Sequence, residues 1–136
     1  MKKISINATI NTPKVVLDPD KMIFEISGES RPKDIPKFYK PILHWLEEFG
    51  QNLSEQQEDT TLFEFNFDFE YFNSLSAKYI LDICKKLSSH GSGGKYFSVK
   101  WHYEEDDDDM HEVGQEMSRI SKLPIEYLEI KHNLAH

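Results

Sequence analysis

One segment of the sequence gathers hydroxyl and amide side chains at the junction between two predicted elements. It reads Tyr-Phe-Asn-Ser-Leu-Ser-Ala-Lys over residues 71–78 and follows an alternating, strand-like stretch. A helix is predicted to start within it, where the first turn leaves backbone N–H groups without intrahelical partners. Asn73 or Ser74 is suited to cap these groups, and capping alone is one interpretation of the cluster. The other is that a serine here is phosphorylated, because a negative charge at an exposed helix N-terminus gains about 0.3–1 kcal/mol.

Phosphorylation at such a junction would alter binding rather than folding. A partner docked there would have to strip water from a dianion, which costs several kcal/mol if the charge stays unpaired, and each ~1.4 kcal/mol changes affinity tenfold. We therefore predict a partner-binding surface at this junction, bordered by part of the segment at residues 28–32. Its predicted members are Asn73, Ser74, Leu75, Ser76, Lys78, Glu29, Ser30 and Arg31.

A run of six consecutive acidic residues, Glu104–Asp109, is the second chemically distinctive feature. Such a run is usually a solvated, self-repelling loop. Calcium binding is a sharper alternative, but the spaced ligands, central glycine and distant glutamate of an EF-hand are missing. A third interpretation is an acidic rim that steers a basic partner, and on this basis the predicted partner surface includes Asp106, Asp107, Asp108 and Asp109. We predict no metal site and no cofactor.

Other residues with chemical potential are better explained by structure. The Gly-Ser-Gly-Gly-Lys stretch at residues 91–95 follows a predicted helix and is not followed by Ser or Thr, which indicates a helix stop rather than a phosphate-binding loop. The six histidines show no paired metal-ligand spacing, so His44 and His102 are expected to pack or to lie on the surface. Cys84 lies on an apolar helical stripe and is predicted to be a core residue.

The predicted elements alternate between strands and helices. The clearest strand covers residues 61–70, where four phenylalanines alternate with polar side chains and share one face. An amphipathic helix follows the junction and is expected to end at the glycines near residue 91. The other expected strands are 4–10, 15–17, 22–26, 95–103 and 125–130, and the other expected helices are 34–49 and 110–120. The connecting segments are a break at 28–32, a possible kink at Pro41, a helix stop at Gly50, a polar linker at 51–60 and an acidic loop at 104–109.

This order predicts an α/β class, or α+β sandwich, with a mixed sheet of about five to six strands and helices packed on it. The 136 residues suit one domain over residues 1–136. A formal charge of −8 argues against a general nucleic-acid binder. No apolar run approaches the ~20 residues of a membrane span, and no signal peptide is evident, so a cytoplasmic location is expected. The single cysteine excludes an internal disulfide.

Four segments, in this order, resemble the SiaC family of bacterial regulatory phosphoproteins, whose fold is similar to STAS and anti-anti-sigma-factor domains. Each motif is weak by itself, but together they are fairly specific and span most of the chain. They are Gly28–Pro32; Phe38–Ile42 leading into Trp45 and Leu46; Tyr71–Lys78; and Trp101–Tyr103 running into Asp106–Met110, with Glu112 and Gly114.

The resemblance implies a non-enzymatic regulator that acts by partner switching. Such proteins are phosphorylated by a dedicated Ser/Thr protein kinase and dephosphorylated by a PP2C-type phosphatase. Their unphosphorylated form binds and activates a diguanylate cyclase, which raises cyclic di-GMP and promotes aggregation or biofilm formation. The usual acceptor is threonine, and the matching position here is Ser74, with Ser76 as the rival. If the helix begins at Ser74, the hydroxyl of Ser76 lies in the first turn and is partly occupied by the backbone.

Two alternatives to this function remain open from the sequence. One is a small metal-dependent hydrolase that uses the acidic loop to hold a metal and His102 or His111 as a base. It is weakened because a contiguous run cannot readily surround an ion, whereas metal hydrolases draw ligands from several elements. The other is a constitutive scaffold without a switch.

Overall fold

A computed structural model describes residues 2–56, 61–89 and 96–132. Within these ranges the chain forms six strands, all in one sheet, and three helices. The strands are β1 (Ile4–Ile6), β2 (Lys14–Asp18), β3 (Ile23–Ser30), β4 (Phe63–Phe72), β5 (Phe97–Glu104) and β6 (Ile125–Ile130). The helices are α1 (Ile35–Glu55), α2 (Ser74–Ser89) and α3 (Asp108–Ser121). The predicted mixed sheet with packed helices is confirmed.

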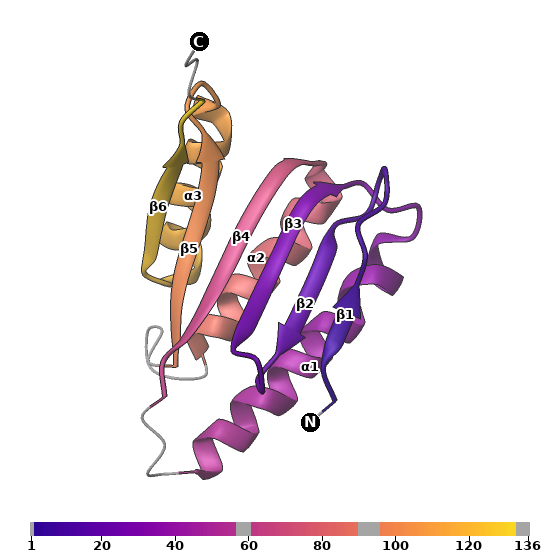
Figure 1. Cartoon of the computed structure of the whole chain (residues 1–136), viewed down its shortest axis with the longest axis vertical. Coiled ribbons are helices and arrows are strands. Elements are labelled where there is room, and N and C mark those ends of the chain that lie inside the picture. The colour runs from indigo at the N-terminus through magenta and orange to yellow at the C-terminus, as the bar shows by residue number, and fades with distance from the viewer. Residues whose placement is uncertain (1, 57–60, 90–95, 133–136) are drawn as a thin grey trace.

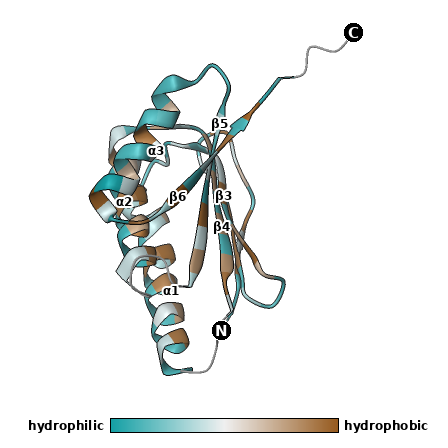
Figure 2. Cartoon of the chain, turned by 90° about the vertical axis from the view of Figure 1, so that its left-hand side faces the viewer, coloured by the Kyte–Doolittle hydropathy of each residue, from teal (hydrophilic) through white to brown (hydrophobic). Residues whose placement is uncertain are grey.

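The strands lie in the sheet in the order in which the chain forms them. β1, β2 and β3 are antiparallel neighbours, whereas β3 to β6 run parallel to one another. A helix follows each of β3, β4 and β5, because two neighbouring parallel strands need a crossover connection. All three helices pack on one face of the sheet, and no described helix covers the other (Figures 1 and 2). The carboxyl ends of β3 to β6 therefore meet at one edge.

The row of phenylalanines in β4 forms the centre of the core, as the alternation predicts. The exposed fractions of Phe63, Phe65, Phe67 and Phe69 are between 0% and 6%, and these rings face the helices. The polar residues between them lie on the uncovered face. Phe24 of β3 packs against this row, with its ring centroid 5.3 Å from that of Phe63. Cys84 is also buried, so its predicted place in the core is confirmed.

The predicted ends of the first strand and of the first helix are both wrong. α1 runs past Gly50 to Glu55, so the first part of the predicted polar linker is helical. The physical reason is Leu53, which is only 4% exposed and extends the buried stripe of the helix by one turn. Pro41 lies inside this helix, which continues on both sides of it. The expected strand at residues 4–10 ends at Ile6, because the chain then enters a turn in which the Thr9 N–H donates to the Thr12 carbonyl.

The predicted break at residues 28–32 is instead largely strand, since β3 continues to Ser30. Gly28 adopts a φ of +104°, which favours glycine, and the pairing with β4 shifts between Gly28 and Glu29. β4 covers residues 63–72 instead of 61–70, and β5 begins at Phe97. The glycine-rich stretch at 91–95 lies outside the described residues.

Gly114 lets α3 lie directly on the indole of Trp101. A Cβ atom at Gly114 would stand 2.6 Å from Trp101 Nε1, which is closer than non-bonded atoms approach. The same Nε1 donates a hydrogen bond of 3.0 Å to the carbonyl oxygen of Met110. Trp101, Met110 and Gly114 of the last family-like segment therefore share one structural role, which is to hold α3 against β5.

The Gly114→Ala variant is expected to lose stability despite the better helix propensity of alanine. The added methyl group must displace a fully buried indole, and overpacking of this kind costs about 1–3 kcal/mol. Chemical denaturation followed by circular dichroism measures this loss. Gln115→Ala, an exposed change in the same helix, is the matched control and should shift stability by less than about 0.5 kcal/mol. A Gly114→Ala protein as stable as the parent would contradict the close contact.

Candidate partner-binding site

The edge formed by the carboxyl ends of the parallel strands brings together most of the predicted site segments. The Asn73 N–H donates to the Ser30 carbonyl at 3.1 Å, so the chain leaving β4 lies beside the end of β3. The Arg31 N–H donates to the Asn11 carbonyl at 2.8 Å, which attaches the β1–β2 loop to the same place. The Glu105 N–H donates to the Ile130 carbonyl at 3.0 Å, next to the start of α3.

Asn73 is the N-cap of α2, and Ser74 is the first helical residue. The Asn73 side-chain oxygen accepts a 2.9 Å hydrogen bond from the Ser76 N–H, and the Asn73 carbonyl accepts one of 3.0 Å from the Ala77 N–H. Of the two cap candidates that the sequence leaves open, the structure selects Asn73. The hydroxyl of Ser74 is left without a capping role.

The two serines of this turn differ sharply in access. Ser74 is exposed and its side chain has no hydrogen-bond partner among the described residues, whereas Ser76 has no exposed surface. The Ser76 hydroxyl donates to the Ser30 carbonyl at 3.0 Å. A kinase can therefore reach Ser74 in this fold, while Ser76 would have to leave the interior first.

Ser30, Ser76 and Tyr39 form a buried chain of hydroxyl groups that joins β3, α2 and α1. The Ser30 hydroxyl donates to Ser76 Oγ at 3.0 Å and also shares a hydrogen bond with the phenol of Tyr39. Because Ser30 donates to Ser76, the Tyr39 O–H is the donor toward Ser30. Burial raises the pKa of Tyr39 to about 12, although its hydrogen bonding with Ser30 and Ser76 acts against this rise. Ser30 and Ser76 were predicted as partner contacts, and for their buried side chains that prediction is wrong.

Exposed apolar side chains are placed at the same edge as Ser74. Leu75, the next residue of the helix, is 64% exposed, and Tyr71 at the end of β4 is 49% exposed. Ile10 in the β1–β2 loop is 85% exposed. Lys78 is exposed as well, one turn further along α2. The sequence does not predict that Ile10 belongs to this exposed surface, because its alternation with Ile4 and Ile6 indicates a strand, whereas in the structure it lies in a loop.

Glu29 and Arg31 lie at the end of β3 and form an ion pair with each other, with 2.8 Å between Arg31 Nη2 and Glu29 Oε2. Both side chains are partly exposed, and Ser30 between them contacts the junction. The two residues therefore lie beside the junction, and their contact with a partner stays a prediction.

Only the middle of the acidic run, residues 105–107, is the predicted loop, and the two ends of the run belong to regular elements. Glu104 is the last residue of β5, and Asp108 and Asp109 form the first turn of α3. Asp107 caps this helix, because its side-chain oxygen accepts a 3.0 Å hydrogen bond from the Met110 N–H. Acidic residues at a helix N-terminus are stabilised by the helix dipole, which reduces the repulsion that the run would otherwise suffer. Asp106, Asp108 and Asp109 remain exposed at the same edge.

The arrangement required for a metal-dependent hydrolase is not formed by the described residues. Among them, no three His, Cys, Asp or Glu side chains come together to hold a metal. His111 of α3 stacks on Tyr103 with ring centroids 4.2 Å apart. His102 lies on the uncovered face of the sheet, where its Nε2 is 2.8 Å from Asn66 Oδ1. The two candidate bases therefore face opposite sides of the sheet.

The edge therefore presents an exposed hydroxyl at a helix N-terminus together with exposed apolar side chains on a mixed α/β scaffold, and such apolar side chains suit contacts with other proteins. The chain belongs to the SiaC family of regulatory phosphoproteins, whose family model matches residues 6–130. The family suggested by the sequence motifs is thus confirmed. The further likeness to STAS domains stays a prediction.

Several proteins of Pseudomonas aeruginosa are similar to this chain. The chain is 25% identical over 124 residues to an uncharacterized protein of strain UCBPP-PA14, and this alignment covers 91% of this chain and 94% of that protein. The crystal structure of apo-SiaC matches with a TM-score of 0.76 and 23% identity, over 94% of this chain and 99% of that one. A crystal structure of the diguanylate cyclase SiaD in complex with its activator SiaC matches with a TM-score of 0.79 and 22% identity, over 93% and 99%. At this level of identity the two structures confirm the fold.

No helix among the described residues is long and apolar enough to cross a membrane.

The Asn73→Ala variant should destabilise the protein by about 0.5–2 kcal/mol, because the Ser76 N–H loses its acceptor. Ser74→Ala is the matched control in the adjacent position, and its free energy of unfolding should stay within about 0.5 kcal/mol of the parent. Urea denaturation of both variants measures the difference. Equal losses would show that Ser74, too, supports the helix end.

The raised pKa of Tyr39 predicts a loss of stability at alkaline pH. The phenol titrates near its ordinary pKa of 10.0 in the unfolded chain and near 12 in the folded one. Between these values the folded state holds a proton that the unfolded state has lost, so the free energy of unfolding falls as pH rises. Between pH 9 and 12 the free energy of unfolding of the parent should therefore fall by roughly 2–3 kcal/mol more than that of Tyr39→Phe. Urea denaturation at several pH values across this window measures both. Parallel curves for the two proteins would exclude this role.

Proposed function

We propose that this protein is a non-enzymatic regulator that exchanges partners according to the phosphorylation of Ser74. The observation that carries the proposal is the contrast within one helical turn, where Ser74 is exposed and Ser76 has no exposed surface. A dedicated Ser/Thr kinase would add the phosphate to Ser74, and a PP2C-type phosphatase would remove it. The spare N–H groups and the positive dipole end of α2 favour a negative charge at this position, so the fold tolerates it.

The surroundings of Ser74 suit a partner surface that such a phosphate would disrupt. Leu75 and Tyr71 offer apolar area that is worth burying only against another protein. A dianion at Ser74 would have to lose its water within that contact, at a cost of several kcal/mol. Moving a complex from 99:1 to 1:99 needs about 5.5 kcal/mol, which is within reach of an unpaired phosphate at the centre of an interface.

The partner that we propose for the unphosphorylated form is a diguanylate cyclase, which the protein would activate to raise cyclic di-GMP and promote aggregation or biofilm formation. Two findings support this: membership of the SiaC family, and the shared fold with a SiaC protein solved in complex with the diguanylate cyclase SiaD as its activator. The exposed Asp106, Asp108 and Asp109 lie at the same edge as Ser74 and would attract a basic surface of the cyclase or the kinase. A cytoplasmic location is consistent with these partners.

Phosphopeptide mapping after incubation with the cognate kinase tests the acceptor. Phosphate is expected on Ser74, and Ser74→Ala should abolish it, whereas Ser74→Thr, which restores the residue usual in the family, should retain it. Phosphate found only on Ser76 would contradict the assignment.

Phosphorylated and unphosphorylated protein are then titrated against the cyclase. At least about a hundredfold loss of affinity is expected on phosphorylation, which corresponds to ~2.7 kcal/mol. Equal affinities would indicate a constitutive scaffold instead.

Leu75→Ala should weaken cyclase binding by about tenfold or more, because it removes the most exposed apolar side chain of α2 from the proposed contact. Ile120→Ala is the matched control, since Ile120 is 45% exposed near the far end of α3. Calorimetric titration of both unphosphorylated variants with the cyclase separates them. A loss of affinity that is equal in both, or confined to Ile120→Ala, would place the interface elsewhere.

A further inference from the structure

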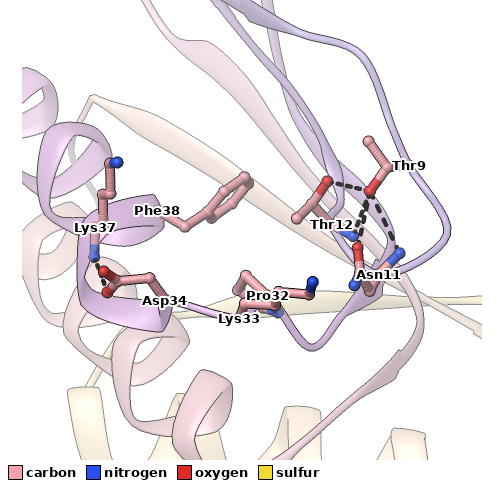
Figure 3. A pocket seen from close by; sticks show the side chains of 8 residues that line it. All are labelled: Thr9, Asn11, Thr12, Pro32, Lys33, Asp34, Lys37 and Phe38. Carbon is pink, nitrogen blue, oxygen red and sulfur yellow. Dashed lines mark hydrogen bonds between the residues drawn. The ribbon is translucent and has the colours of Figure 1, made fainter.

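A cleft of about 670 Å³ opens between the β1–β2 loop and the start of α1. It belongs to the same edge of the sheet as Ser74, but none of its lining residues is part of the α2 junction. Figure 3 shows the two walls, with the loop on one side and the first turn of α1 on the other. The lining residues are Thr9, Asn11, Thr12, Pro32, Lys33, Asp34, Lys37 and Phe38.

The loop wall of the cleft is held in shape by its own hydrogen bonds. Thr9 Oγ1 accepts from the N–H groups of Asn11 and Thr12, at 3.3 and 3.0 Å. The Asn11 carbonyl is fixed by the Arg31 N–H, so the loop is tied to the segment that leads into α1. Hydroxyl and amide groups are therefore already in place along this wall without a ligand.

The charge of the cleft is unusual for an acidic chain. Lys33 and Lys37 are both exposed, and neither forms an ion pair with a described residue. The acidic group beside them, Asp34, is engaged as the N-cap of α1, where its side-chain oxygen accepts from the Lys37 N–H at 3.2 Å. In a protein of formal charge −8, two unpaired ammonium groups at one cleft favour a small anion there.

Apolar groups supply the remaining surface. Phe38 is half-buried, and its ring extends into the cleft from the helix wall toward Thr12 (Figure 3). An edge contact with Tyr39, at 5.0 Å between centroids and 75° between planes, limits the positions this ring can adopt. Pro32 is buried beside it. A rigid aromatic ring of this kind can stack on a planar ligand ring.

We propose that this cleft binds a nucleotide, with the base against Phe38 and the phosphates toward the exposed ammonium groups of Lys33 and Lys37. Its volume falls in the range of small-molecule sites, and its lining combines one accessible aromatic ring with several polar and charged groups. The Thr9 hydroxyl is occupied within the loop, so the Asn11 amide and the Thr12 hydroxyl would supply hydrogen bonds to the sugar or the base edge. A single nucleotide carries few enough charges to approach this acidic chain, whereas a nucleic-acid strand would meet repulsion over its whole length. The site does not depend on the phosphorylation of Ser74.

Calorimetric titration of the full chain with GTP, cyclic di-GMP and inorganic phosphate tests this proposal. At least one nucleotide is expected to bind about tenfold more tightly than phosphate, because phosphate lacks the ring contact. Lys33→Gln and Lys37→Gln should each weaken nucleotide binding about tenfold. Lys40→Gln is the matched control, since Lys40 is exposed in the same helix but does not line the cleft, and it should leave binding unchanged. Ser74→Ala should also bind like the parent, which separates this site from the proposed switch.

Three outcomes would overturn the proposal. The first is no saturable binding of either nucleotide at millimolar concentration. The second is equal binding of nucleotides and phosphate, which would exclude a contact with the base. The third is nucleotide binding that Lys33→Gln and Lys37→Gln leave as strong as Lys40→Gln does. Because all three substitutions change exposed lysines, circular dichroism is expected to show folded proteins, and the comparison rests on binding alone.

Discussion

The hydrogen bonds between Ser30 and the first turn of α2 determine how the rest of the site is presented. The Ser30 carbonyl accepts from both the Asn73 N–H and the Ser76 hydroxyl, and so fixes the start of the helix against the neighbouring strand. With Asn73 and Ser76 both engaged in this way, Ser74 is the one serine of the turn left facing solvent. The buried hydroxyl of Ser76 therefore has a structural role, whereas the hydroxyl of Ser74, two residues earlier, is available for modification.

This separation is what allows one modification to change binding without changing the fold. A phosphate on Ser74 would meet water, spare N–H groups and the positive end of a helix dipole, and none of these penalises a negative charge. The same phosphate in a protein interface would lie near Leu75 and Tyr71, which cannot pair with it. The free-energy cost then falls on the complex alone, as a partner switch requires.

The sequence predicts well those elements whose pattern is local. The alternating phenylalanines of β4 and the short β6, whose predicted bounds at 125–130 match the structure, depend on residues in direct succession. The prediction fails where tertiary contacts decide. Leu53 extends α1 because a core is there to receive it, and β3 continues through Gly28 because β4 is alongside. The acidic run enters α3 because Asp107 caps the helix. An Asp N-cap is a local sequence signal, but within six consecutive acidic residues it is not apparent which of them is the cap.

The candidate site divides in the same way. Ser74 and Asn73 can be located from the junction sequence, because helix capping follows known residue preferences. The burial of Ser30 and Ser76 cannot, since it arises from the parallel pairing of β3 and β4 and from Tyr39 on a different helix. Ile10 and the lysine-lined cleft also depend on a loop that meets α1 only after the sheet has formed.

The free energy of unfolding of protein phosphorylated on Ser74, compared with that of the unmodified chain, tests most directly whether the modification acts on binding alone. Urea denaturation of the two forms at neutral pH measures it. We expect the values to agree within about 1 kcal/mol, because the exposed phosphate gains or loses little at the end of α2. A loss of several kcal/mol on phosphorylation would show that the phosphate disrupts the fold itself, and would contradict a switch located at the surface.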